Sequence, residues 1–561
     1  MTTLLIENSR VLDVHALTLR SGLSVLVQDG RIAAVGADVV APEGATVLDA
    51  RGMTLMPGLI DCHVHVVASS FNLGAVAKMP NVFTMMRSLP IMKGMLERGF
   101  TTVRDAGGAD WSLAEAVRTG LVQGPRIFPA GKALSQTGGH ADFRQRNDDL
   151  DVCSCAYKLG NIGRVVDGVD ACRLAVREEI LKGATQIKVM ASGGVASPND
   201  PIGNLGYSEA ELHAIVEEAS NANTYVMAHA YTPRAIARAV RCGVRTIEHG
   251  NLVDAPTAEF MAEMGAFMVP TLITYEGLAN EGERYGLPAV SIAKIDSVRG
   301  QGKQAIEILA KAGVKMGLGS DLLAETHYLQ SDELRLRAEI LGNGPVLQQA
   351  TLIGAEILGQ QGQLGEVTAG AIADILLVDG NPLTDITCLL NQGERIRADI
   401  AQVESLKIDV LINNAGAGQT GPIADVPIDR VRHLFEVNVF GTLAITQAVL
   451  PQMVARGSGR IIIMSSVAGV MSGPSFGPYS MTKHALEAMG KALRAEIAGQ
   501  GIDVTLINPG PYNTGFNDRM AQAWLLGASV AALAAWVAIL GFYAGEAGRA
   551  FVAPLLSHYG S

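Results

Sequence analysis

The stretch LIDCHVHVV at residues 59–67 decides the fold of most of this chain. It is a short apolar run, and because side chains alternate along a strand, His63 and His65 lie on the same face. Cys62 points to the opposite face, where we expect buried packing rather than metal binding. A buried strand that ends in polar residues is typical of a β/α barrel, whose active site lies at the carboxyl ends of the strands.

Similar apolar runs recur down the chain, each followed by a polar or helical stretch. They are TTVRDAG (101–107), RIFPAG (126–131), QIKVMASGG (186–194), YVMAHA (225–230), TIEHG (246–250), FMVPTLI (267–273) and VKMGLGSD (314–321). This alternation over residues 59–354 predicts an α/β fold, a β/α (TIM) barrel of parallel strands rather than a doubly wound sheet.

The segments that flank the barrel have the character of short strands. Residues 1–58 alternate apolar and polar positions and predict small antiparallel strands, and residues 362–382 return to the same pattern. We therefore expect 1–58 and 355–397 to form one small β-sandwich domain from both ends of the barrel segment.

The composition changes near residue 398, where charged residues fall from about 20% to about 13%. Three further apolar runs follow, KIDVLINNAG, GRIIIMSS and GIDVTLINPG, separated by helical stretches. Residues 398–561 thus predict a second, partial Rossmann-like α/β unit.

The overall composition narrows the class of function. The 561 residues are 48% hydrophobic and 18% charged, with a net charge of -11, which indicates a globular protein that binds a small molecule rather than nucleic acid. Six cysteines without regular spacing argue against a disulfide scaffold, and the first residues lack a long apolar run. We expect a cytoplasmic protein.

Polar side chains gather at the ends of the predicted barrel strands: His63, His65, Lys188, His229, His249 and Asp321. A single histidine at such a place usually makes an ordinary hydrogen bond, but polar residues at so many strand ends are harder to explain in that way. Imidazole and carboxylate suit a divalent metal such as zinc, and a lysine can serve two metals only as a carbamate.

These motifs resemble the amidohydrolase superfamily over residues 1 to about 397. The resemblance rests on HVH at 63–65, IKVMASGG around Lys188, AHAY at 229, EHG at 249 and GSD at 319–321. The stretches SQTGGHAD (135–142) and IKVMASGGVASP (187–198) are similar to metal-dependent dipeptidases and carboxypeptidases, a branch with prolidase-like and ochratoxin amidase-like enzymes.

The resemblance implies a binuclear amidohydrolase that cleaves a dipeptide or N-acyl amino acid by attack of a metal-bound hydroxide. His63, His65 and Asp321 would hold one of two divalent metals, expected to be zinc, and His229 and His249 the other. Carbon dioxide would enter as the Lys188 carbamate that bridges them. Asp321 would carry the proton from water to the leaving amine.

Two further residues are candidates for contact with the substrate. In the family branch, positions like those of His140 and Tyr231 contact the substrate carbonyl or carboxylate, and we expect these two to orient the substrate or stabilise an oxyanion. The alternatives are a loop-closing hydrogen bond for His140 and simple packing for Tyr231.

Residues 398 to about 520 resemble the short-chain dehydrogenase/reductase family. The motifs are NNAG at 413–416, Asn438 in NVFG, Ser466, the pair Tyr479 and Lys483 in YSMTK, and NPG at 508–510. The resemblance implies that Lys483 lowers the pKa of Tyr479, which exchanges a proton with the substrate while Ser466 holds it.

This second unit lacks the front of that family's fold. No strand followed by a Gly-rich turn precedes NNAG, although such a turn receives the pyrophosphate of a dinucleotide. A fusion of a hydrolase to a truncated dehydrogenase is therefore the expected organisation. An NAD(P)-dependent oxidoreductase remains the alternative function, and so does a C-terminal unit that serves only oligomerisation.

The partners expected from the sequence are few. We expect a small-molecule amide or dipeptide substrate, a homo-oligomer and no nucleic acid. The uncharged stretch 520–545 is long enough to cross a bilayer, but paired lid helices of a soluble unit are the favoured interpretation.

Overall fold

The computed structural model describes residues 3–144, 158–195, 197, 200–284, 287, 289–390, 408–414, 416–418 and 421–509. The chain divides into two compact units, Met1–Gln392 and Gly393–Ser561. The stretch 520–545 lies outside the described residues.

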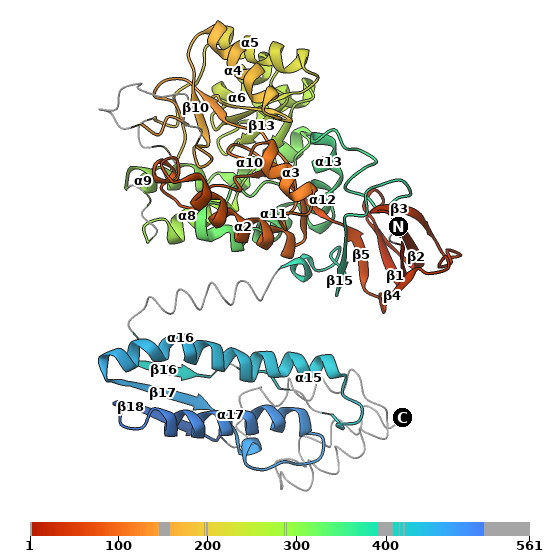
Figure 1. The fold of residues 1–561 in the computed structure, drawn as a ribbon, viewed down its shortest axis with the longest axis vertical. Coiled ribbons are helices and arrows are strands. Elements are labelled where there is room, and N and C mark those ends of the chain that lie inside the picture. The colour runs from red at the N-terminus through yellow and green to blue at the C-terminus, as the bar shows by residue number, and fades with distance from the viewer. Residues whose placement is uncertain are drawn as a thin grey trace. The chain divides into compact units, whose positions relative to one another are not determined.

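A six-stranded sheet joins the two ends of the first unit (Figure 1). Its order is β15-β5-β1-β2-β3, with β4 beside β1. The strands are β1 (Thr3–Asp13), β2 (Thr18–Gln28), β3 (Arg31–Gly36), β4 (Thr46–Asp49), β5 (Thr54–Pro57) and β15 (Ile375–Val378). Because β15 runs antiparallel to β5, the end of this unit does return to its beginning. The expectation of antiparallel pairs alone is wrong, since β4 and β5 pair with β1 in parallel.

Parallel strands build the larger part of the first unit. One sheet has the order β6-β7-β8 and the other β10-β9-β11-β12-β13-β14. The strands are β6 (Leu59–Val64), β7 (Phe100–Asp105), β8 (Arg126–Phe128), β9 (Ala133–Ser135), β10 (Gly163–Val165), β11 (Ile187–Met190), β12 (Val226–Ala230), β13 (Thr246–His249) and β14 (Phe267–Val269). The buried Gln186 amide links the sheets, since its Nε2 donates to the carbonyls of Asp105 and Phe128.

The sequence patterns missed β9 and β10 and overstated the last run, 314–321. That run forms no regular strand: Met316 makes one bridge to Met268, and the carbonyl of Leu318 accepts from the Cys62 amide at 2.7 Å. Gly317 and Gly319 let neighbouring segments pack closely against this run. A Cβ on Gly319 would come within 2.5 Å of Val269 and 2.9 Å of His63, so glycine is needed where these segments approach closely.

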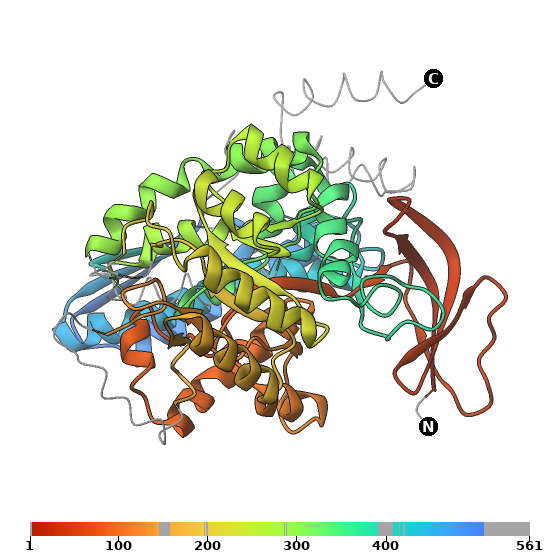
Figure 2. The same ribbon diagram turned by 90° about the horizontal axis from the view of Figure 1, so that it is seen from above.

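Helices lie outside these strands, and the small sheet lies to one side of them (Figures 1 and 2). This is the arrangement of a TIM-barrel-type fold. The helices are α1 (Leu73–Val76), α2 (Asn81–Glu97), α3 (Trp111–Arg118), α4 (Val169–Leu181), α5 (Glu209–Asn221), α6 (Pro233–Arg241), α7 (Ala255–Glu263), α8 (Ile273–Glu281), α9 (Ala289–Arg299), α10 (Gly302–Ala312), α11 (Asp332–Leu341), α12 (Asn343–Gln349) and α13 (Leu352–Ile357).

Local sequence signals start several of these helices. Ser208 and Glu211 form a capping box at α5, and the side chain of Asp110 accepts from two backbone amides at the start of α3. Between the helices and the strands lies an apolar layer. Cys62 is fully buried there and packs in one cluster with Ala355 and Ile357 of α13.

The second unit contains three parallel strands in the order β16-β17-β18. They are β16 (Val410–Asn413), β17 (Gly459–Met464) and β18 (Ile502–Ile507), and they match the three predicted runs. The helical elements are α15 (Ile428–Phe435), the π-helix η3 (Glu436–Phe440), α16 (Gly441–Arg456), the short η4 (Val467–Gly469) and α17 (Gly477–Glu496).

One helical run among the described residues, Arg430–Arg456, has the length and composition of a membrane span. Core helices of soluble proteins pass the same test. Here Val449 and Met453 of this run pack with Ile461 and Ile463 of β17 in one core cluster.

Candidate metal centre

One cavity of about 60 Å³ collects every site residue that the sequence predicts in the first unit. Its lining includes His63, His65, His140, Lys188, His229, Tyr231, His249 and Asp321. They come from β6, β11, β12 and β13, from the residues directly after β6 and β12, from the loop after β9 and from the irregular segment after α10, and these segments are up to about 260 residues apart in the chain. The carboxyl ends of the parallel strands therefore meet at this cavity.

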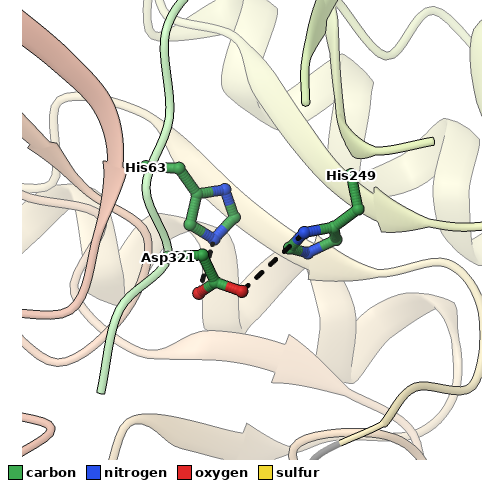
Figure 3. Close-up of side chains that lie close together, drawn as sticks. All are labelled: His63, His249 and Asp321. Atoms are coloured by element: carbon green, nitrogen blue, oxygen red, sulfur yellow. Dashed lines mark ion pairs between the residues drawn. The ribbon is translucent and has the colours of Figure 1, made fainter. Parts of the chain in front are cut away.

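Asp321 lies at the centre of the histidines (Figure 3). Its Oδ1 is 3.4 Å from Nε2 of His63 and 3.4 Å from Nε2 of His65, and its Oδ2 is 3.8 Å from Nδ1 of His249. The ligand atoms of His63, His249 and Asp321 lie within 4.8 Å of one another. This is the spacing of side chains that can share a cation.

Burial prepares the imidazoles for metal binding. It lowers the pKa of His65 to about 4, and it lowers the pKa values of His63, His229 and His249 well below the ordinary value. A histidine binds a metal only through an unprotonated nitrogen. At neutral pH these rings are therefore ready to act as ligands.

A buried carboxylate that the sequence analysis missed orients the first histidine. Oε2 of Glu248 lies 2.7 Å from Nδ1 of His63, and Arg104 donates through Nη2 to both Glu248 oxygens at 2.9 and 3.0 Å. All three side chains are buried. Because Nδ1 is engaged by Glu248, Nε2 is the nitrogen of His63 that faces the cavity.

A second missed carboxylate, Asp61, holds the backbone on both sides of the site. It accepts from the amide of His63 at 3.0 Å, from the amide and hydroxyl of Ser320 at 3.1 and 2.6 Å, and from Nε2 of Gln330 at 2.8 Å. Asp321 itself has φ 51° and His249 has φ 71°. Such left-handed backbone is costly away from glycine, and Asp61 helps to fix it next to Asp321.

Lys188 is buried within β11 (Ile187–Met190). Burial lowers the pKa of its amine to about 8, against the opposing effect of Glu248 and Asp321. A neutral amine is the form that can react with carbon dioxide, so the surroundings of Lys188 favour the chemistry that a carbamate requires.

His140 and Tyr231 occupy the other side of the cavity. The His140 ring stacks on His229 with 4.3 Å between ring centres, and its Nδ1 lies 2.9 Å from Oγ of Ser197. The Tyr231 hydroxyl pairs with that of Tyr275, a residue of α8 that the sequence analysis did not identify, at 2.8 Å. His140 follows β9, a strand that the sequence patterns missed.

The donor set fits a divalent cation. Neutral imidazoles and one carboxylate converge from separate strands in a buried cavity, and a carboxylate outside the set fixes one of the rings. A candidate metal site at the carboxyl ends of parallel strands is an arrangement used by metal-dependent hydrolases with this fold.

Comparison with known proteins gives the family. Residues 54–401 match the amidohydrolase family, and the chain belongs to it. Ochratoxinase from Aspergillus niger is 32% identical over 387 residues, which cover 65% of this chain and 78% of that protein. A crystal structure of a prolidase complexed with N-methylphosphonate-L-proline is 60% identical, covers 70% of this chain and 96% of that one, and gives a TM-score of 0.69. The chain is a hydrolase that acts on C–N bonds.

The second unit has separate relatives. Residues 370–523 match the short chain dehydrogenase family. An NADPH-dependent 3-dehydrocapnine reductase from Ornithobacterium rhinotracheale is 47% identical over 111 residues, but these span only 39% of that protein. The chain is therefore a fusion of an amidohydrolase with part of a dehydrogenase.

The dehydrogenase-like residues do come together. Tyr479 and Lys483 lie one turn apart on α17, with Nζ of Lys483 5.6 Å from the centre of the Tyr479 ring. Asn438 lies in the π-helix η3, where its Oδ1 accepts from the Ala417 amide at 2.7 Å. The Ser466 side chain hydrogen bonds to Tyr479.

The expected effect of Lys483 on the pKa of Tyr479 stays a prediction. Burial raises the pKa of Tyr479, and a hydrogen bond with Ser466 opposes that shift. Nζ of Lys483 donates to the carbonyl of Met464 at 2.8 Å. Burial lowers the pKa of Lys483 itself to about 8.

Proposed function

We propose that this chain is a binuclear metal-dependent dipeptidase that cleaves the amide bond of Xaa-Pro dipeptides and of N-acyl amino acids with a free carboxylate. The observation that carries the proposal is the convergence of His63, His65, Lys188, His229, His249 and Asp321 on one cavity. The substrate class comes from the prolidase relative, whose bound N-methylphosphonate-L-proline places a tetrahedral phosphorus where an acyl-proline has its carbonyl carbon.

We propose the division of ligands that the resemblance implies, although His249 also lies near His63 and Asp321. His63, His65 and Asp321 would hold one divalent metal, and His229 and His249 the other, with carbamylated Lys188 between them. When bound, such metals polarise the scissile carbonyl and lower the pKa of a water into the neutral range. Zinc suits this mixture of imidazole and carboxylate ligands.

Asp321 is the proposed proton carrier. Burial raises the pKa of its carboxyl to about 7, although Lys188 opposes the shift. This value belongs to the metal-free protein, and bound metals would lower it. A carboxylate beside the attacking water can accept a proton from it and return the proton to the leaving amine. Bond cleavage then leaves a carboxylate and a protonated amine, which together carry both protons of the attacking water, with no oxidant or reductant required.

His140 and Tyr231 are proposed to bind the substrate rather than the metals. Both line the cavity and both can donate a hydrogen bond to a carbonyl oxygen or a carboxylate. Burial raises the pKa of Tyr231 well above its ordinary value, so its hydroxyl keeps its proton and remains a donor.

A substrate panel with metal analysis tests the proposal. Purified protein, loaded with zinc in bicarbonate buffer, is given Xaa-Pro dipeptides, N-acetyl amino acids and the corresponding amides without a carboxylate. We expect about two metals per chain and cleavage only of substrates with a free carboxylate. Equal cleavage of the carboxylate-free amides would overturn the substrate class, and one metal at full activity would overturn the binuclear centre.

The second candidate function is an NAD(P)-dependent oxidoreductase in the C-terminal unit. The hydrogen bond between Ser466 and Tyr479 favours it, and the missing Gly-rich turn opposes it. Titration of NADPH with the protein, followed by NADPH fluorescence, decides between an oxidoreductase and a unit that serves only oligomerisation. Saturable binding supports the oxidoreductase, and its absence leaves oligomerisation as the proposed role of this unit.

A further inference from the structure

The Lys294 ammonium donates hydrogen bonds to three backbone carbonyls that follow β11 in the amidohydrolase unit. Its Nζ, on α9, donates to the carbonyls of Gly194 at 3.0 Å, Ser197 at 2.8 Å and Asp200 at 2.7 Å. An ammonium group has three N–H donors, so these contacts use all of them. The loop after β11 is thus tied at three points to a helix that is about 100 residues away in the chain.

The same loop fixes the His140 ring. Nδ1 of His140 lies 2.9 Å from Oγ of Ser197 and 3.3 Å from Oδ2 of Asp200. The backbone of Gly194 packs against the ring so closely that a Cβ there would come within 2.1 Å of His140. Ser197 and Asp200 are buried, so the contacts to His140 are shielded from water.

The helix that carries Lys294 is itself anchored. Arg299 of α9 pairs with Glu276 of α8 through two contacts of 2.5 and 2.9 Å, and Asn251 donates to the carbonyl of Val298. Helix α8 also carries Tyr275, which pairs with Tyr231 in the cavity. Lys294 therefore ties the loop that holds His140 to the helix pair that holds Tyr231.

We infer that Lys294 is a positioning residue that holds His140 in place through the loop from Gly194 to Asp200. The inference rests on the proposed function in one respect, the contact of His140 with substrate. A neutral side chain would leave three carbonyl dipoles converging without a donor, so the loop would relax and release the ring. Arginine keeps the charge, but its planar group cannot match the three directions of an ammonium.

A double-mutant cycle tests this inference. Lys294→Met, His140→Ala and the double variant are compared by kcat and KM on a dipeptide that the wild type cleaves. Lys303→Met is the matched control, because Lys303 lies on the neighbouring α10 and pairs only at the surface with Glu339. We expect Lys294→Met to lower kcat/KM by about 10- to 100-fold at unchanged metal content, with Lys303→Met within about twofold of the wild type.

The double variant gives the decisive comparison. If Lys294 acts through His140, the double variant is no less active than His140→Ala alone. Losses that multiply would overturn the inference, as would wild-type activity in Lys294→Met. Lys294→Gln, whose amide keeps two N–H donors without the charge, replaces Lys294→Met should that variant not fold.

NMR of the His140 ring tests the positioning role of Lys294 without any measurement of enzyme activity. In protein labelled with ¹³C at histidine, the His140 ring signal is the one that disappears in His140→Ala. We expect it to move in Lys294→Met and to stay in Lys303→Met. A shift in a protein that cleaves no dipeptide would refute the proposed substrate and retain the positioning role, and an unmoved signal would refute that role alone.

Discussion

Oε2 of Glu248 lies 2.7 Å from Nδ1 of His63, and both side chains are fully buried. Glu248 also accepts from Arg104 and from the Thr246 hydroxyl, so its oxygens are occupied by four contacts. A carboxylate behind a histidine fixes the tautomer and the direction of the ring, and it raises the basicity of the nitrogen that faces a metal.

We expect Glu248→Gln to weaken metal binding by roughly 10- to 100-fold, because the amide cannot polarise His63 as a carboxylate does. It also leaves the buried Arg104 without its charge partner, which costs about 3 kcal/mol or more of unfolding free energy. Competition with a chelator measures the affinity. Glu356→Gln is the control, since Glu356 pairs with Lys315 at the helix surface and should bind metal as the wild type does. Equal affinities in the two variants would contradict the prediction.

Lys188 gives a prediction about bicarbonate. Burial lowers the pKa of its amine to about 8, and only the neutral amine adds carbon dioxide. Protein depleted of bicarbonate and metal should therefore regain activity faster at pH 8 than at pH 6 when both are returned. Lys188→Arg and Lys188→Ala should lose at least about 100-fold in kcat at any bicarbonate concentration. A variant that kept both metals and full activity would exclude a bridging carbamate.

Protonation of Asp321 should affect the stability of the metal-free protein and its metal affinity in opposite directions. Burial raises the pKa of Asp321 from 3.8 to about 7, so the folded metal-free protein keeps a proton that the unfolded chain releases. The contribution of Asp321 to stability should fall as the pH rises from about 4 to 7, whereas the buried histidines, whose pKa values are lowered, contribute in the opposite direction. Metal affinity should rise over the same range because the metal binds the carboxylate.

Asp321→Asn separates the two effects. Without metal, this variant should melt a few degrees above the wild type at pH 7 and close to it at pH 4, since it carries no charge at either pH. It should bind metal weakly throughout. Thermal melting of chelator-treated protein at both pH values is the measurement, and a lower Tm at pH 7 would show that Asp321 is stabilising when ionised.

The sequence predicted the cavity-lining residues at the strand ends better than the residues that hold them in place. His63 and His65 follow strand alternation, so both were expected on the cavity side, and Cys62 packs on the opposite side. Glu248 precedes His249 directly, and alternation would send the two apart, yet both reach the site because the left-handed φ of His249 ends the regular strand. Glu248, Asp61 and Lys294 act through contacts with distant segments, which periodicity along one strand cannot reveal.

Two apolar side chains of β16 are exposed on one face of the sheet of the second unit, as far as its described residues show. Val410 and Ile412 alternate with Leu411 on β16, and they are 50% and 57% exposed against 9% for Leu411, which packs with Val449. Replacing Val410 and Ile412 by threonine should reduce binding of an apolar dye while changing the unfolding free energy by no more than about 0.5 kcal/mol.

Leu411→Ala is the matched control on the same strand. It removes a core side chain and should destabilise the unit by about 2 kcal/mol or more. Chemical denaturation of the full chain, followed by dye fluorescence, distinguishes the variants. A comparable loss of stability on threonine substitution of Val410 and Ile412 would mean that the exposed face is covered in solution.

Deletion of residues 393–561 tests whether the hydrolase depends on its fusion partner. Every residue that lines the metal cavity precedes residue 324, and β15, which completes the small sheet, ends at Val378. The chain 1–392 corresponds to the first compact unit. We therefore expect it to bind metal like the full chain and to keep kcat/KM within about twofold, measured on the same dipeptide at equal metal content. A loss of more than tenfold with metal content retained would mean that the dehydrogenase-like unit supports catalysis, and analytical ultracentrifugation of both forms would then show whether it does so through assembly of several chains.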